Sequence, residues 1–116
     1  MTEKYPLSLN KNKMDKETSR VVKKFASRIR KKYQPELFLL FGSRARGDNF
    51  KSSDYDFIIV SKKFHKTRFI LRPAEFFDYW DESVDIEPLC YTPEEFERKK
   101  KEIGIVSQAV KEGIEI

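Results

Sequence analysis

Two aspartates and a glycine–serine pair are the residues of this 116-residue chain whose types and spacing could support chemistry. Asp54 and Asp56 lead into the apolar run 57–60, and Gly42–Ser43 follows the apolar run 37–41. In an extended strand alternate side chains share a face, so the two aspartates would lie with Cα atoms about 6 to 7 Å apart. Carboxylates this close repel, at about 4 kcal/mol for a 4 Å separation and an effective dielectric near 20. A divalent cation removes that repulsion, and Mg²⁺ is usually held by one or two carboxylates together with substrate phosphates.

The Gly42–Ser43 turn would supply the phosphate-binding half of such a site. Glycine lets backbone N–H groups approach an anion closely, and the serine hydroxyl adds a further donor. Ten residues separate this serine from Asp54, and strand-like runs adjoin both halves of the motif. The alternative interpretation is that Asp54 and Asp56 form only the solvated face of a half-buried strand.

Segments 42–48, Gly-Ser-Arg-Ala-Arg-Gly-Asp, and 53–56, Ser-Asp-Tyr-Asp, closely resemble the nucleotidyltransferase superfamily that includes DNA polymerase β. More narrowly, the chain resembles a minimal nucleotidyltransferase (MNT) domain over about residues 20–116. The resemblance implies an α/β fold in which helices flank a small mixed sheet. It also implies two Mg²⁺ ions on three carboxylates, and transfer of a nucleoside monophosphate from a nucleoside triphosphate such as ATP.

The third carboxylate is expected on the stretch Val84–Leu89, which alternates like a strand and places Asp85 and Glu87 on one face. The family pattern has an acidic residue on a strand of this kind. The resemblance assigns Asp85, which precedes an apolar position as its family counterpart does, and Glu87 is the alternative. Both could instead be exposed strand residues without a role in the site.

The resemblance also implies roles for the residues of the turn. Gly42 and Ser43 would bind the departing phosphates. Arg44 and Arg46 would neutralise the charge growing on pyrophosphate, since guanidinium groups pair bidentately with phosphate oxygens. For each arginine the alternative is a surface charge or an ion pair.

The elements that must position these residues can be predicted from apolar spacing. From about Asp15 a three- and four-residue repeat predicts a helix that Pro35 ends; its apolar residues are Val22, Phe25, Ala26, Ile29 and Tyr33. Strands are predicted at 36–41 and 54–60, and a short helix with a loop at 44–53. Segment 64–80 is aromatic-rich and predicts a helix after Pro73 that packs on the sheet, with nucleobase stacking as the alternative role for its rings.

The C-terminal segment carries a strong helix start at Thr92, with Pro93 in the first turn and Glu95 completing a capping box. An apolar stripe then predicts one helix up to Gly113; its residues are Phe96, Ile103, Val106 and Val110. Cys90 and Tyr91, just before this helix, are expected to be packed.

Composition predicts one small domain over residues 14–116, preceded by a flexible tail over 1–13. The chain holds one cysteine and one histidine, which exclude an internal disulfide and a Cys/His zinc cluster. No apolar run is long enough to span a membrane, and a cytoplasmic location is expected. Residues 1–35 carry eleven basic and three acidic side chains, a charge that suits nucleic acid, an acidic partner or only water.

Stand-alone MNT proteins similar to this chain associate with a small helical HEPN-domain protein. In such toxin–antitoxin pairs the MNT member adenylylates a tyrosine of the HEPN ribonuclease. The resemblance therefore implies an antitoxin that uses ATP and Mg²⁺, with the HEPN protein as both acceptor and partner. Two alternatives stay open: an antitoxin that neutralises by binding alone, and a basic nucleic-acid-binding module.

Overall fold

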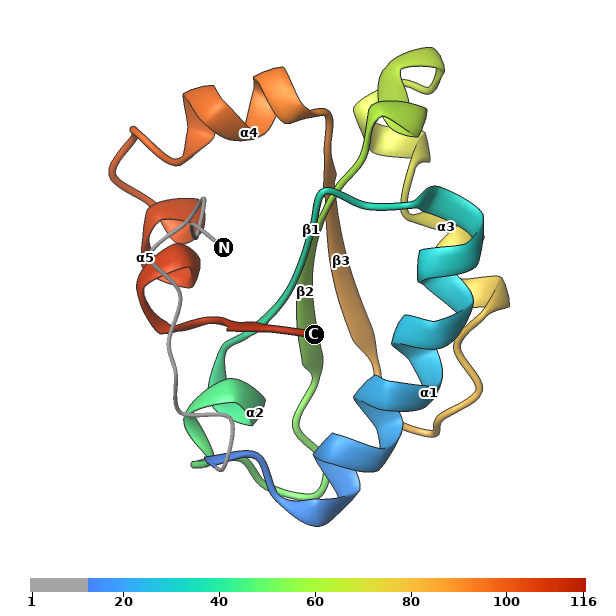
Figure 1. Ribbon diagram of the computed structural model, residues 1–116. Helices are drawn as coiled ribbons and strands as arrows, with labels where there is room; N and C mark the ends of the chain where they lie inside the picture. The colour runs from blue at the N-terminus through green and yellow to red at the C-terminus, as the bar shows by residue number, and fades with distance from the viewer. Residues whose placement is uncertain (1–12) are drawn as a thin grey trace, which may run out of the picture.

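The computed structural model describes residues 13–116, so the tail predicted at 1–13 lies almost wholly outside the described residues. Helices and strands alternate along the described chain, as Figure 1 shows. Their bounds are α1 Lys16–Tyr33, β1 Leu37–Phe41, α2 Ser43–Arg46, β2 Tyr55–Val60, the 3₁₀ helices η2 Lys62–Lys66 and η3 Phe69–Leu71, α3 Ala74–Asp78, β3 Ile86–Tyr91, α4 Pro93–Lys99, α5 Ile105–Glu112 and β4 Ile114–Glu115.

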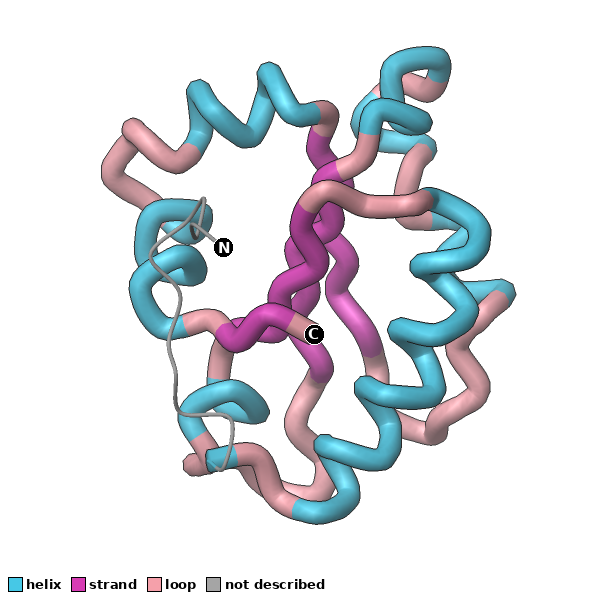
Figure 2. The backbone as a smooth tube through the Cα atoms, viewed as in Figure 1, coloured by secondary structure: helices cyan, strands magenta, loops and turns pink. Residues whose placement is uncertain are grey.

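The four strands form one mixed sheet in the order β3-β2-β1-β4 (Figure 2). Strand β1 pairs antiparallel with β2 and with β4, whereas β2 and β3 run parallel. A parallel pair needs a long connection, and segment 61–85 with η2, η3 and α3 supplies it. The predicted α/β fold, a small mixed sheet flanked by helices, is confirmed.

Each face of the sheet has its own apolar core, with α1 and α3 on one side and α4 and α5 on the other (Figure 1). On the first face the Phe25 ring of α1 lies 5.1 Å, centroid to centroid, from both Phe57 and Trp80. On the second face Ile58 and Val60 of β2 pack with residues of α4 and α5. Because side chains alternate along β2, the even-numbered positions, Asp56 among them, belong to this second face.

Helix α1 begins and ends as its sequence predicts. The side chain of Asp15 caps its first turn by accepting from the Thr18 N–H at 2.7 Å. At its end Gln34 adopts a left-handed conformation, with φ of 47°, directly before Pro35. The predicted apolar stripe is buried, so the helix packs on the sheet through the face that its periodicity marks.

The aromatic segment contains the predicted helix, α3, directly after Pro73. Phe76 is fully buried in the first core, and Trp80 packs against that core. Phe69 and Phe77, in contrast, stay about half exposed. The segment therefore covers the sheet with part of its rings and leaves others at the surface.

Three predictions need correction. Strand β3 begins at Ile86 and runs to Tyr91, two residues later than predicted, so Asp85 precedes the strand. The single C-terminal helix is wrong: the chain turns after Lys99 and a second helix starts beyond Gly104. Ile103, counted as part of the apolar stripe, lies in this turn and is fully exposed. Strand β4 was not predicted, because two residues carry too short a pattern to recognise.

Among the described residues, no helix has both the length and the apolar character needed to cross a membrane.

Candidate active site

The predicted motif residues meet at one end of the sheet, where β1 ends and β2 and β3 begin. In the sheet register Asp56 lies between Phe41, the last residue of β1, and Glu87 of β3. Partners on adjacent parallel strands share a face, and neighbouring strands are about 4.8 Å apart. The carboxyl groups of Asp56 and Glu87 therefore emerge next to each other from the face that α4 and α5 cover farther along.

The electrostatics of Asp56 reflect this crowding. Its pKa is raised to about 6, first by burial, then by the negative charges of Glu87 and Asp54 and by a hydrogen bond with the Glu87 side chain. Arg46 acts in the opposite direction and is too weak to reverse the shift. A carboxyl held in this way ionises reluctantly, and a divalent cation would relieve both the repulsion and the incomplete solvation.

Asp85 occupies a different position from the one predicted for it. Like Glu87 it is exposed, but it precedes β3, and its backbone carbonyl accepts a hydrogen bond from the Tyr55 N–H at 3.0 Å. Continuing the register by one pair places it beside Asp54 rather than Asp56. The geometry therefore favours Glu87, the alternative named from the sequence, as the third carboxylate.

Gly42 forms the junction between β1 and α2 and lies close to the Asp56 side chain. Its φ of 76° is one that residues with a side chain rarely adopt. A Cβ at this position would lie 2.4 Å from Oδ2 of Asp56. Only glycine therefore lets the turn approach the carboxylate this closely. Ser43, partly exposed, opens α2 directly beside it.

Arg44 lies in a buried position that argues against the role predicted for it. The side chain is buried, 2% of the residue being exposed, and its guanidinium lies 4.2 Å from the centre of the Tyr55 ring. It donates hydrogen bonds to the carbonyls of Lys51 and Ser53 and to the Thr18 hydroxyl, at 3.0 to 3.2 Å. These contacts tie the loop between α2 and β2 to α1. The expectation that Arg44 contacts phosphate does not fit this burial, and we assign it to positioning the loop that carries Asp54.

Arg46, at the other end of α2, is exposed and remains near the carboxylates. Its guanidinium forms ion pairs with Asp48 at 3.2 Å and with Glu112 of α5 at 3.0 Å. Exposed pairs of this kind are weak, so a phosphate group could replace them. The contact with Glu112 was not expected from the sequence, because 66 residues separate the two and no local pattern links them.

The acidic residues supply oxygen ligands of the type that Mg²⁺ prefers. Within residues 13–116, however, no three acidic, cysteine or histidine side chains stand close enough to be recognised as a metal site. The chemistry of the donors therefore fits a divalent cation, whereas their side chains are not gathered around a common point.

Comparison with known proteins adds an independent line of evidence. The model of a family described as nucleotidyltransferase domain matches residues 22–115. The crystal structure of a “putative nucleotidyltransferase” from Sulfolobus solfataricus resembles the chain with a TM-score of 0.57 and 22% identity, over 84% of this chain and 80% of that one. At that identity the likeness concerns the fold. No protein of curated function matches the chain.

Proposed function

The chain belongs to the nucleotidyltransferase domain family, and from this membership we propose that it transfers AMP from ATP to a hydroxyl of a protein. The main support for this proposal is the position of Asp56 between Glu87 and the Gly42 turn at one end of the sheet. Nucleotidyl transfer needs a group that holds a polyphosphate and acidic side chains that hold Mg²⁺ beside it. The acidic side chains and the glycine turn at this end of the sheet support this proposal.

We assign Asp54, Asp56 and Glu87 to holding Mg²⁺. When bound, the ion would polarise phosphoryl oxygens and make the attacking hydroxyl more acidic. The protein's own groups bind and orient the nucleotide: the backbone at Gly42 and the Ser43 hydroxyl face the phosphates that depart. Arg46 would give up its surface ion pairs with Asp48 and Glu112 and bind the phosphates bidentately, because their charge attracts its guanidinium.

For the acceptor we propose a tyrosine of a HEPN-domain ribonuclease, which makes this chain the antitoxin of a toxin–antitoxin pair. The support is the resemblance of segments 42–48 and 53–56 to stand-alone MNT domains. In this proposal the two proteins form a complex, and modification of the tyrosine inactivates the ribonuclease.

The test combines the purified chain, ATP labelled at the α-phosphate, Mg²⁺ and the HEPN-domain protein that we propose as its partner. We expect label on the HEPN protein, and at least a 100-fold slower reaction for Asp56→Asn and Glu87→Gln. Asp85→Asn is the matched control and should stay within about threefold of the parent. An unlabelled HEPN protein, in a reaction where a known adenylyltransferase labels its own substrate, refutes the transfer.

A second readout separates catalysis from binding. If the chain neutralises the ribonuclease by modifying it, the double variant Asp54→Ala, Asp56→Ala loses neutralisation while still forming the complex. Full neutralisation by this variant would instead indicate an antitoxin that acts by binding alone.

A further inference from the structure

The order of groups across the sheet indicates from which side an acceptor must enter. The Gly42–Ser43 turn adjoins β1, Asp56 lies on the central strand β2, and Glu87 lies on the edge strand β3. In phosphoryl-type transfer the attacking and leaving oxygens are roughly in line, on opposite sides of the phosphorus. If the departing phosphates lie at the turn, as our proposed function requires, the acceptor hydroxyl enters from the side of β3.

A cavity of about 490 Å³ lies on that side, on the same face of the sheet as Glu87. Leu89 and Tyr91 follow Glu87 at steps of two residues, which places them about 7 and 13 Å farther along the strand. The Tyr91 ring stacks on Phe69 of η3, with centroids 5.5 Å apart and planes at 29°. The cavity therefore lies farther along the face of β3 that carries Glu87, and it has an aromatic wall; its lining residues are Phe69, Leu89, Tyr91, Glu95, Arg98, Lys99 and Glu102.

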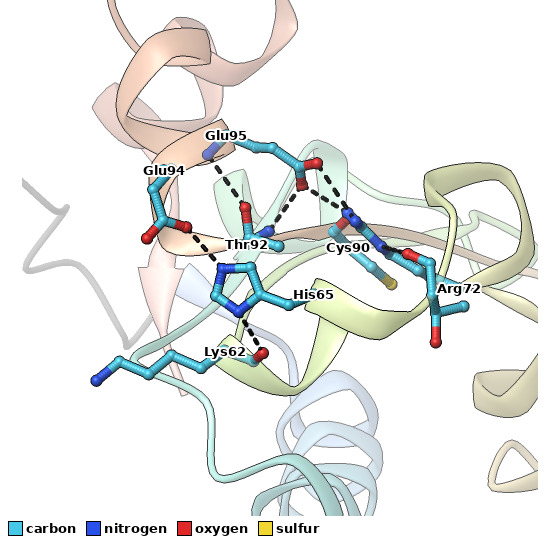
Figure 3. Close-up of polar contacts among 8 residues, drawn as sticks. Lys62, His65, Arg72, Cys90, Thr92, Glu94 and Glu95 are labelled. Carbon is cyan, nitrogen blue, oxygen red and sulfur yellow. Dashed lines mark hydrogen bonds and ion pairs between the residues drawn. The ribbon is translucent and has the colours of Figure 1, made fainter.

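The walls of this cavity are fixed by a buried polar network, shown in Figure 3. Arg72, only 6% exposed, donates to the Cys90 carbonyl of β3 at 3.0 Å and to both carboxylate oxygens of Glu95 on α4, at 2.6 and 3.3 Å. It also donates to the Thr67 carbonyl at 2.8 Å. These bonds lock the segment that carries Phe69 against β3 and α4. The cavity is thus preformed, as ligand sites usually are.

Exposed apolar side chains and charged side chains adjoin the cavity, and of its charged lining residues Glu95 is paired with Arg72 and Lys99 with Glu102. The three residues of η3, Phe69, Ile70 and Leu71, are 46%, 78% and 58% exposed. Arg98 borders the cavity from α4, and its guanidinium makes no ion pair or hydrogen bond within the part of the chain that the structure describes. A contiguous exposed apolar patch marks an interaction surface, and an unpaired arginine beside it favours an acidic partner.

We propose that the cavity and the three residues of η3 form the acceptor-docking surface, and that its occupant is an acidic protein segment. Such a segment would place its apolar side chains on η3 and its carboxylates at Arg98, and so lead the acceptor hydroxyl to the β3 side of Asp56. Strand addition to β3 is not the mode of docking, since Pro88 offers no N–H and the Cys90 carbonyl is already bonded to Arg72.

Binding tests the surface without any catalysis. The probe is a fluorescent random copolymer of glutamate and tyrosine, titrated with the full chain at 0.15 M salt. We expect Phe69→Ala and Arg98→Glu each to weaken its Kd at least tenfold, and Asp56→Asn to leave it within about twofold. Arg30→Glu, an exposed charge reversal on α1, is the matched control. A Phe69→Ala protein that binds like the parent, or an Arg30→Glu protein as impaired as Arg98→Glu, overturns the proposal.

Transfer of label from ATP to the same copolymer then distinguishes the two proposals. If the docking surface is correct, Phe69→Ala raises KM for the copolymer at least tenfold and changes kcat less than threefold. Copolymer that binds through η3 and is never labelled would refute transfer to a tyrosine docked at this surface and keep the surface as a binding site. Labelling that is equally fast for parent, Phe69→Ala and Arg98→Glu would keep the transferase and refute the surface.

Discussion

Replacement of Asp56 by asparagine should stabilise the protein at neutral pH and abolish its activity. Burial and the charges of Glu87 and Asp54 raise the pKa of Asp56 to about 6, from an ordinary value of 3.8. The folded protein therefore binds this proton more tightly than the unfolded chain does. Its free energy of unfolding falls as the pH rises from about 4 to above 6, because the carboxyl must ionise where ionisation is unfavourable.

The size of this change in the free energy of unfolding follows from the rise of about two units in the pKa of Asp56. Each unit corresponds to 1.36 kcal/mol, which gives a ceiling of about 3 kcal/mol at pH 7.5. Asp56 is partly open to solvent, and screening reduces the value to about 1 to 2 kcal/mol. In a domain of this size that corresponds to about 4 to 8 °C in Tm. Asparagine stays neutral, so Asp56→Asn should gain this amount at pH 7.5 and much less at pH 4, where the folded carboxyl is protonated and the unfolded one, with an ordinary pKa of 3.8, is about half protonated.

Scanning calorimetry at pH 4, 5.5 and 7.5 measures the difference, with Asp85→Asn as the control expected to stay within about 0.5 kcal/mol at every pH. Added Mg²⁺ should raise the Tm of the parent at pH 7.5, by the equivalent of about 1.4 kcal/mol when the free ion exceeds its Kd tenfold. It should leave Asp56→Asn unchanged. A gain for Asp56→Asn of equal size at pH 4, or a lower Tm at pH 7.5, would refute the reasoning that ionisation of Asp56 is disfavoured.

Three further perturbations test neighbouring features. Gly42→Ala should cost about 2 kcal/mol or more in chemical denaturation and lower transfer, since its φ of 76° and the 2.4 Å approach to the adjacent carboxylate both exclude a Cβ; a stable, active variant contradicts this. Arg44→Ala should cost about 3 kcal/mol, and Arg44→Lys should recover less than half, because an ammonium cannot reach the three acceptors of the buried fork; equal stability of Arg44→Lys and the parent would show that the fork is dispensable. Cys90, whose burial raises its thiol pKa to about 12, should resist iodoacetamide at pH 8 until urea unfolds the chain; rapid labelling of the native protein would indicate local opening at β3.

Much of the fold could be predicted because its elements carry local signals. The apolar repeat and the Asp15 cap define α1, and the runs before Gly42 and after Asp54 define β1 and β2. The break between α4 and α5 carried no such signal, because Ile103 continues the helical spacing although it lies in the exposed turn. The point at which α4 ends depends on how α4 and α5 pack on the sheet, and this packing involves residues distant in the sequence.

The site was only partly predictable for the same reason. Asp54, Asp56 and the Gly42 turn are close in sequence, so the strand and turn geometry places them together. The choice between Asp85 and Glu87 depends on the register of β3 against β2, and the connection between these strands, residues 61–85, does not encode that register locally. A shift of two residues keeps every side chain on its face and still changes which acidic group stands beside Asp56.

The burial of Arg44 shows the corresponding limit for charged residues. Two arginines on one short helix look equivalent in the sequence, yet one is enclosed and the other is exposed beside the carboxylates. The difference arises because the loop that follows α2 folds its carbonyls around Arg44 and binds it to α1. Residue type alone does not show which of the two arginines is exposed, since this depends on the path of the loop between α2 and β2.

The charge crowding that weakens this domain is concentrated at one end of the sheet. Gly42 holds a left-handed conformation, and Asp56 is partly buried beside two other acidic groups. Elsewhere in the described chain polar groups are well paired, and no buried side-chain nitrogen or oxygen lacks a hydrogen bond. Charge crowding of this kind weakens the folded state, so its confinement to the motif residues favours a functional origin over a structural one. If Asp56→Asn both stabilises the protein and abolishes nucleotidyl transfer, the same carboxylate destabilises the folded state and is required for activity.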